Sequence, residues 1–261
     1  MTICYPTNNR LFKGCKMKKM KNFVVLLFLL LNTFLYGDIT NKYYDNQREK
    51  LIEIIKQEVK NTSEYLKKDS LDKRVIDAIN SVPRHKFVPF YSHLYAYDNR
   101  PLPIGHGQTI SQPYIVAIMT DLLNLKPLDQ VLALGTGSGY QAAILAQIVK
   151  EESSIEVIEP LGLKAKKRLK RLGYKNIKTR IADGYYGWRE HAPYDAIIVT
   201  ASAGHIPSPL LKQLKPGGRM IIPVGSLFFV QQLILIQKDQ KGDLTTRQIM
   251  PVRFVPLTGK H

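Results

Sequence analysis

The sequence is poor in cysteine, and this scarcity narrows what the chain can be. Its two cysteines, Cys4 and Cys15, both precede residue 38, so the rest of the chain has no disulfide, thiolate metal site or cysteine nucleophile. The histidines show no metal-ligand spacing, and no Gly-Lys-Ser/Thr phosphate-binding motif occurs. Internal repeats and low-complexity tracts are also lacking. We therefore expect an ordinary hydrophobic core and no metal.

The composition is that of a globular protein with an excess of positive charge. Its 261 residues, 44% hydrophobic and 23% charged, suffice for one sizeable α/β domain with a small addition. The formal net charge of +17 suggests at first sight a nucleic-acid or membrane partner. Much of it lies before residue 38 and between Lys164 and Lys175. We interpret the second run as the solvated face of a helix and expect no nucleic-acid partner.

Residues 1–37 are typical of a signal peptide or membrane-targeting segment. Basic residues 18–21 precede the apolar run 23–31, and Gly37 ends a tolerable cleavage site. The run is short for a membrane span, which favours a cleaved signal over an anchor. We therefore expect export to the periplasm, with inner-membrane anchoring or a cytoplasmic location as alternatives. No stable membrane partner is expected beyond this segment.

The remainder is predicted to be an N-terminal helical extension, residues 38–82, followed by one domain, residues 83–261. Residues 38–48 are predicted to be a polar linker, and apolar periodicity predicts amphipathic helices within 51–59 and 71–82. Residues 84–114 have many turn residues and little periodicity. Because long irregular segments in compact domains usually carry function, we expect a functional loop there.

From Gln130 onward, short apolar strands alternate with helices, which predicts a mainly parallel sheet covered on both faces. Strands are expected at 131–134, 155–158, 176–182, 195–200 and 219–224, and helices at 141–149, 163–172 and 208–214. Two further strands, at 233–237 and 252–255, have no helix between them and predict an antiparallel C-terminal edge. The predicted fold class is α/β, Rossmann-like and doubly wound, with N-terminal helices.

A glycine-rich turn follows the first predicted strand. Gly135, Gly137 and Gly139 come directly after the strand and before an apolar helix. Glycine suits this place because a backbone without Cβ can turn sharply and let a ligand approach its N–H groups. The spacing differs from the Gly-x-Gly-x-x-Gly of dehydrogenases. Ser138 lacks the Gly-x-Ser-x-Gly framing of a hydrolase nucleophile.

Two acidic residues fall near the carboxyl ends of predicted strands, where ligands bind in such sheets. Glu156 lies about 20 residues past the glycine turn, where an acid can accept hydrogen bonds from a ribose diol. Asp183, with Gly184, is suited to the polar edge of a base. Alternatives remain open, because Glu156 could pair with lysines of the next helix, Glu159 competes for its role, and Asp183 could simply begin a turn.

Several longer segments together resemble one family. They are Val82–Val88, Leu102–Tyr114, Val131–Tyr140, Asp183-Gly184, Asp195–Thr200, Leu214–Gly218 and Arg253–Leu257. From about Val82 to Gly259 the chain is similar to the protein-L-isoaspartate O-methyltransferases, which use S-adenosylmethionine and have a class I methyltransferase fold. The segment Leu102–Tyr114 is the most specific, because general methyltransferases share the glycine motif but not its Gln-Thr-Ile-Ser-Gln-Pro.

The resemblance implies a cofactor site and an active-site serine. The implied cofactor-binding residues are Gln108, Thr109, Ser111, Gly135, Gly137, Ser138, Gly139, Glu156, Asp183, Gly184 and Thr258. The glycines would meet the methionine portion of S-adenosylmethionine, Glu156 the ribose, and Asp183 with Gly184 the adenine. The loop from Gln108 to Ser111 would close over cofactor and substrate.

The implied reaction transfers a methyl group to the free carboxylate of L-isoaspartyl residues in damaged proteins and peptides. The methyl ester then collapses to a succinimide, which begins repair. Because the carboxylate is already ionised at neutral pH, in-line attack needs no strong general base. We therefore expect the catalytic residue Ser111 to orient the carboxylate and not to become acylated.

One position departs from the family pattern. The family carries an acidic residue two positions before the first motif glycine, where this chain has Ala133. We expect weakened cofactor binding, and an alternative is a catalytically weak protein that binds isoaspartyl peptides. A methyltransferase acting on another carboxylate, or on RNA through the basic helix, is a further alternative. No coiled-coil seam is evident, so a monomer is expected.

Overall fold

The computed structural model describes residues 42–226 and 229–260. Arg48–His261 form one compact unit. The predicted targeting segment, residues 1–37, lies outside the described residues. Within the described part of the chain, no helix has both the length and the apolar character needed to span a membrane.

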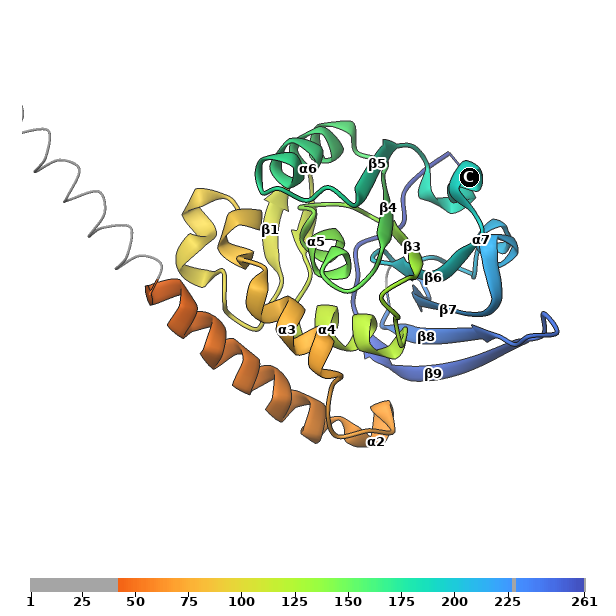
Figure 1. Ribbon diagram of the computed structural model, residues 1–261, viewed down its shortest axis with the longest axis horizontal. Coiled ribbons are helices and arrows are strands. Elements are labelled where there is room, and N and C mark those ends of the chain that lie inside the picture. Colours follow the sequence, from red (N-terminus) through yellow and green to blue (C-terminus); the bar gives the residue numbers. More distant parts are fainter. Residues whose placement is uncertain (1–41, 227–228, 261) are drawn as a thin grey trace, which may run out of the picture. The chain divides into compact units, whose positions relative to one another are not determined.

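A seven-stranded sheet forms the centre of the unit (Figure 1), in the order β5-β4-β3-β6-β7-β8-β9. Its strands are β3 (Gln130–Leu134), β4 (Glu151–Glu156), β5 (Ile177–Ile181), β6 (Tyr194–Val199), β7 (Leu214–Val224), β8 (Gln231–Lys238) and β9 (Leu244–Val252). Neighbours from β5 to β7 run parallel, whereas β8 and β9 are antiparallel additions. The predicted α/β fold with an antiparallel edge is confirmed.

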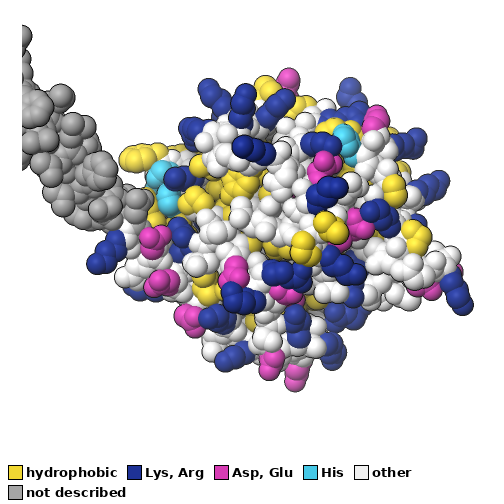
Figure 2. Space-filling view, viewed as in Figure 1, with side chains coloured by type: hydrophobic (Ala, Val, Ile, Leu, Met, Phe, Trp, Pro, Cys, Tyr) yellow, Lys and Arg dark blue, Asp and Glu magenta, His cyan; other side chains and the backbone are white. Residues whose placement is uncertain are grey.

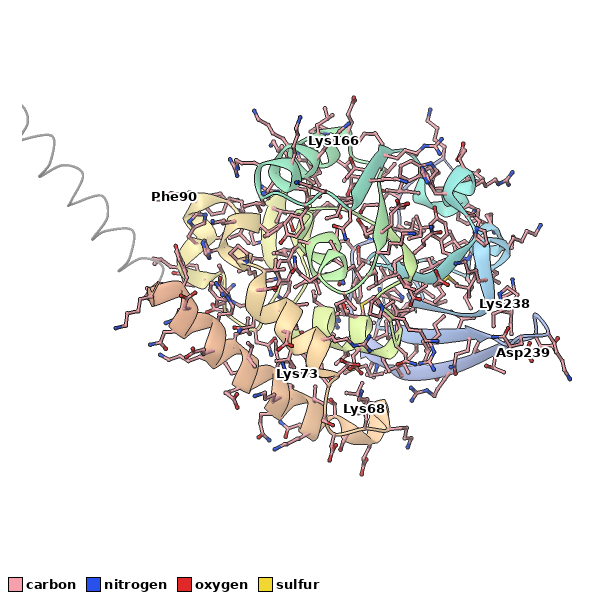
Figure 3. The ribbon with its side chains drawn as sticks, viewed as in Figure 1. Lys68, Lys73, Phe90, Lys166, Lys238 and Asp239 are labelled. Carbon is pink, nitrogen blue, oxygen red and sulfur yellow. The ribbon has the colours of Figure 1, made fainter. Side chains whose placement is uncertain are left out.

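Helices complete the architecture. They are residues 42–61, α2 (Ser63–Leu66), α3 (Lys73–Ser81), α4 (Pro113–Leu122), α5 (Tyr140–Ala146), α6 (Glu159–Arg171) and α7 (Ser208–Gln213). β3 is buried on both faces, which explains its continuous apolar run. Most basic residues of α6 are exposed, as the labelled Lys166 shows in Figure 3, and Lys and Arg side chains gather over this helix in Figure 2. Arg168 differs, because it is half-buried and its Nη1 donates to the Ser138 carbonyl at 2.7 Å. Apart from Arg168, the α6 part of the run from Lys164 is therefore a solvated helix face, as predicted.

Several elements differ from the sequence prediction. β7 begins at Leu214 and α6 at Glu159, five and four residues before their predicted starts. β4 begins at Glu151, four residues before the predicted start, because its polar residues Glu152–Ser154 are buried and pair in register with β3. The last strand is β9 and not 252–255. As an edge strand with many exposed polar side chains, β9 lacks the apolar signal that prediction needs. Residues 42–48 of the predicted linker are helical.

The predicted functional loop, residues 84–114, is organised into short elements. These are the 3-10 helices η1 (Arg84–Phe87) and η2 (Phe90–Tyr95), then a hairpin of β1 (Leu102–Gly105) and β2 (Gln108–Ile110). Residues 105–107 at the hairpin turn all have positive φ, which glycine adopts most easily. The hairpin delivers the end of β2 and Ser111 to the carboxyl edge of the sheet.

Candidate active site

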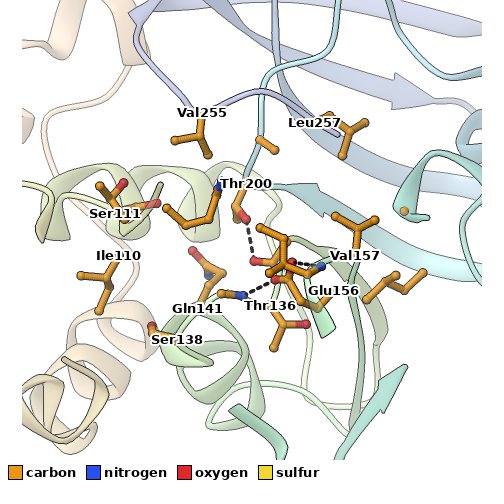
Figure 4. Close-up of a pocket in the computed structure, with 18 of the residues that line it drawn as sticks. Ile110, Ser111, Thr136, Ser138, Gln141, Glu156, Val157, Thr200, Val255 and Leu257 are labelled. Atoms are coloured by element: carbon orange, nitrogen blue, oxygen red, sulfur yellow. Dashed lines mark hydrogen bonds between the residues drawn. The ribbon is translucent and has the colours of Figure 1, made fainter. Parts of the chain in front are cut away.

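The glycine turn between β3 and α5 forms one wall of a cavity at the carboxyl edge of the sheet (Figure 4). Gly135, Gly137 and Gly139 have φ values of 87°, 53° and 88°. A Cβ on Gly135 would lie only 2.6 Å from Thr200 Oγ1. The Thr200 hydroxyl lies 2.8 Å and 2.9 Å from the carbonyl oxygens of Leu134 and Gly135, and donates to them. Glycine at position 135 is therefore a steric requirement of this wall.

The Glu156 carboxylate lies beneath the glycine turn and lines the cavity. Its side chain ends β4, the residue is 5% exposed, and its Oε2 accepts a 2.7 Å hydrogen bond from the Gly137 amide. Oε1 accepts a 2.9 Å bond from the Ile158 amide. Figure 4 shows the group facing the space between the turn and Thr200. Each oxygen keeps a further lone pair, so the oriented carboxylate can accept hydrogen bonds from a diol. Glu159, its competitor in sequence reasoning, is exposed at the start of α6.

Asp183 lies behind the cavity, whereas Gly184 lines it. Asp183 Oδ1 accepts from the Tyr185 amide at 3.0 Å, and Oδ2 accepts from the Lys260 amide at 2.8 Å. The carboxylate thus fixes both the turn that presents Gly184 and the segment around Gly259, which packs directly on it. Contact of Asp183 with an adenine stays a prediction.

Most of the site residues predicted from the sequence line this cavity. Its lining includes Gln108, Thr109, Ser111, Gly135, Gly137, Ser138, Glu156, Gly184 and Thr258. Its empty volume is about 750 Å³, including solvent at the mouth. Gly139 lies outside the lining and caps the start of α5. Ala133 also lies outside it, buried in β3 opposite Ser154 of β4.

Sequence reasoning missed other lining residues. They are Ile110, Val116, Thr136, Tyr140, Gln141, Ile155, Val157, Ile158, Thr200, Ala201 and Val255–Leu257. Thr200 could have been found, because it directly follows β6 at the carboxyl edge of the sheet. The chain after β9 carries the family segment Arg253–Leu257, but nothing in that segment indicates that it reaches the cavity. The backbone pairing of Ser202 with Val255 and Leu257 brings it to the cavity.

A second cavity adjoins the first and shares Thr109, Ser111, Thr200 and Val255 with it. It is larger, with an empty volume of about 1480 Å³ including solvent. Its remaining walls come from the N-terminal helix, from α4 and from residues 250–254. Ser111 therefore stands between two spaces, one beside the glycine turn and one larger cavity.

A buried arginine contacts the backbone of Ser111 at the boundary between the two cavities. Arg84 Nε donates to the Ala96 carbonyl at 2.9 Å, and Nη2 donates to the Ser111 carbonyl at 2.7 Å. Its guanidinium stacks over the Tyr140 ring at 4.8 Å from the centroid. Burial lowers the pKa of Arg84 to about 10 and raises the pKa of Tyr140 to about 12. At neutral pH the arginine therefore stays charged and the tyrosine neutral.

A model of the protein-L-isoaspartate(D-aspartate) O-methyltransferase family matches residues 53–261. The chain belongs to this family. It is 58% identical over 238 residues to protein-L-isoaspartate O-methyltransferase 2 of Syntrophobacter fumaroxidans, covering 90% of this chain and 96% of that protein. It is 59% identical over 211 residues to protein-L-isoaspartate O-methyltransferase 2 of Polaromonas sp., covering 81% and 100%.

Solved structures of the family agree with the fold. One protein-L-isoaspartate O-methyltransferase is 29% identical with a TM-score of 0.72, covering 81% of this chain and 66% of that chain. Another, described as a protein-L-isoaspartate O-methyltransferase from Plasmodium falciparum in complex with S-adenosyl-L-homocysteine, is 25% identical with a TM-score of 0.68, covering 82% and 98%. The resemblance drawn from sequence motifs and the class I methyltransferase fold are both confirmed.

Across residues 42–226 and 229–260, no group of three or more His, Cys, Asp or Glu side chains could hold a metal ion. The polar groups lining the first cavity are hydroxyls, the carboxamides of Gln108 and Gln141, backbone amides and one carboxylate. Such groups suit the recognition of an organic ligand and the orientation of a reacting group.

Proposed function

We propose that the chain transfers a methyl group from S-adenosylmethionine to the free carboxylate of L-isoaspartyl residues in damaged proteins and peptides. Repair then continues through the methyl ester and a succinimide. One observation carries the proposal: Ser111 and Thr200 separate a cavity built on the glycine turn from a larger cavity fit for a peptide. Methyl transfer requires two ligands to meet at one such point.

The first cavity fits S-adenosylmethionine. The ligand supplies a methyl group on a sulfonium. Glu156, already oriented by two amides, offers acceptors for its ribose diol, and the turn at Gly135 and Gly137 presents backbone without Cβ atoms. Gly184 gives the adenine end a flat wall. These residues hold and orient the donor, and none of them needs to transfer a proton.

Ser111 is proposed to orient the isoaspartyl carboxylate. That carboxylate is ionised at neutral pH, so what the protein must supply is alignment and the exclusion of water. Ser111 lines both cavities, and Arg84 holds its carbonyl through a hydrogen bond. The loop from Gln108 to Ser111 covers the boundary. A hydroxyl donor held in this way stabilises the carboxylate in one orientation without forming a covalent bond to it.

The test is methyl transfer from labelled S-adenosylmethionine to a peptide containing isoaspartate, beside the same peptide with aspartate. We expect label on the isoaspartyl peptide alone. Ser111→Ala should lower kcat by about 10²-fold, since one orienting donor is lost. Ser70→Ala, at an exposed serine remote from both cavities, is the matched control. Equal labelling of both peptides, or none by a folded protein, would refute the proposal.

Location and oligomeric state are further proposals. We propose export across the inner membrane, on the support of the basic and apolar order within residues 1–37. Fractionation of cells expressing the full chain tests this, and finding all of the protein in the cytoplasm would contradict it. The protein is also proposed to be a monomer. Light scattering of the purified protein at micromolar concentration tests that point.

A further inference from the structure

The second cavity carries two opposite charges at its wall, Glu58 and Arg253. We propose that these two residues recognise charged side chains next to the isoaspartyl residue in the substrate peptide. Glu58 would take a lysine or arginine side chain of the substrate, and Arg253 an acidic one. This inference rests on the proposed function, because it assigns the second cavity to the damaged peptide.

Glu58 is held on a rigid part of the structure. It lies near the end of the helix 42–61, and the Thr62 hydroxyl donates to its backbone carbonyl at 2.7 Å. The same hydroxyl lies 2.5 Å from the Tyr114 hydroxyl of α4, which in turn contacts Met250 Sδ of β9 at 3.8 Å. These contacts fasten the helix end to the cavity wall. A charge mounted here keeps its position relative to Ser111.

The Glu58 carboxylate is available to a ligand. It is half-buried, lines the cavity, and has no ion-pair partner among the described residues. Glu53, on the same helix, instead faces solvent and pairs with Lys56 at 2.7 Å. Burial raises the pKa of Tyr114, and the negative charge of Glu58 adds to that effect. Glu58 and Tyr114 both line the second cavity.

Arg253 supplies the opposite charge. It is exposed just beyond the end of β9 and lines the same cavity, and no carboxylate among the described residues lies within ion-pair distance of it. Of the described residues that line this cavity, Glu58 and Arg253 are the charged ones. The rest of the wall is mainly apolar or carries hydroxyls. Charge recognition in the cavity is therefore confined to these two positions.

The charges of Glu58 and Arg253 matter because the protein as a whole carries a large positive net charge. The chain carries a formal charge of +17, so its long-range electrostatics disfavour the approach of a cationic peptide. A fixed carboxylate in the cavity offsets that repulsion locally. An exposed or half-exposed ion pair changes affinity by a modest factor. We expect roughly threefold to tenfold effects on kcat/KM for one flanking charge.

The experiment uses short isoaspartyl peptides that differ in one flanking residue, placed on either side and chosen as Lys, Gln or Glu. For each protein, the readout is the ratio of kcat/KM for the charged peptide to that for the Gln peptide. We expect Glu58→Gln to lower the Lys ratio threefold to tenfold, and Arg253→Gln to lower the Glu ratio. Glu53→Gln removes the same charge outside the cavity and should keep the wild-type ratios.

Fluorescence anisotropy of labelled peptides, measured with S-adenosylhomocysteine present, gives a second readout that does not depend on turnover. The same ratios should appear in the dissociation constants. Equal shifts in Glu58→Gln and Glu53→Gln would overturn the proposal, because net charge alone would then explain them. Ratios near one for both charged peptides in the wild-type protein would also overturn the proposal. Lack of turnover on the neutral Gln peptide would refute the proposed function instead, while the binding ratios would still decide this inference.

Discussion

Arg84 donates a 2.7 Å hydrogen bond from Nη2 to the carbonyl oxygen of Ser111, 27 positions along the chain. The guanidinium is fully buried, and its Nη1 has no hydrogen-bond partner within the described part of the chain. Burying a charge with an unmatched donor is costly. The site keeps it nonetheless, and its contacts set the backbone position of the proposed active-site serine.

Replacing this arginine should therefore impair both stability and catalysis. Arg84→Met removes two charge-assisted hydrogen bonds and leaves the carbonyls of Ala96 and Ser111 without them. We expect the free energy of unfolding to fall by about 2–4 kcal/mol. kcat/KM should fall by about 10²-fold, because small misplacements of an orienting group have large effects. Urea denaturation and steady-state kinetics measure the two effects.

Arg100→Met is the matched control for Arg84. Arg100 is an exposed arginine of the same region that pairs with Asp98 at 3.0 Å. Its loss should change stability by less than about 1 kcal/mol. If both variants behaved alike, the contact with Ser111 would have no special role.

Glu156→Gln should weaken binding of the methyl donor. The carboxamide can present an N–H group to the Gly137 amide, which itself donates to the carboxylate at 2.7 Å. Two facing donors disturb the turn, and one acceptor for the diol is lost. We expect the dissociation constant for S-adenosylhomocysteine to rise about 10- to 100-fold by calorimetry. Glu159→Gln makes the same chemical change at an exposed position and should leave binding unchanged. Equal weakening in both variants would reject the ribose assignment.

Glu152 should make the protein less stable as the pH rises. It is fully buried in β4, neither carboxyl oxygen has a hydrogen-bond partner among the described residues, and burial raises its pKa well above 4.5. The folded state therefore holds a proton that the unfolded chain releases. Stability is highest below the unfolded pKa, about 4.3, and is lost as the pH rises toward the folded pKa.

Glu152→Val tests this linkage. Its stability advantage over the wild-type protein should grow as the pH rises above about 4.5. Denaturant melts of both proteins between pH 4 and pH 9 measure the difference. A constant difference across that range would show that Glu152 keeps an ordinary pKa.

Ala133 and Glu152 should affect binding of the methyl donor together. Ala133 shares one face of β3 with Val131, and Val131 pairs with Glu152 of β4. A glutamate introduced at position 133 would lie near a second buried carboxyl, and each would raise the pKa of the other. We expect Ala133→Glu to bind S-adenosylhomocysteine more tightly only when Glu152→Val is also present. Unchanged affinity in the double variant would disprove the prediction that Ala133 weakens binding.

The sequence predicts the parts of the fold and the site that have strong local signals. The glycine turn and the apolar strand β3 can be predicted because their signals, residue spacing and hydrophobicity, come from residues that are adjacent in the sequence. β9 is not predicted, because an edge strand needs few apolar residues and so lacks a hydrophobic pattern. Contacts such as that of Lys260 with Asp183, 77 positions apart, follow from tertiary packing and leave no local pattern. The position of residues 255–257 at the cavity also follows from tertiary packing, through their backbone pairing with Ser202, although the segment Arg253–Leu257 is recognisable in the sequence.

The carboxylate of Glu156 is held by two backbone amides before any ligand arrives. On the proposed assignment, it contacts a part of the methyl donor that the reaction leaves unchanged, and so do Gly135 and Gly184. None of these contacts distinguishes the product S-adenosylhomocysteine from the substrate S-adenosylmethionine. The enzyme should therefore be subject to strong product inhibition. Sustained repair would then depend on a separate activity that removes S-adenosylhomocysteine.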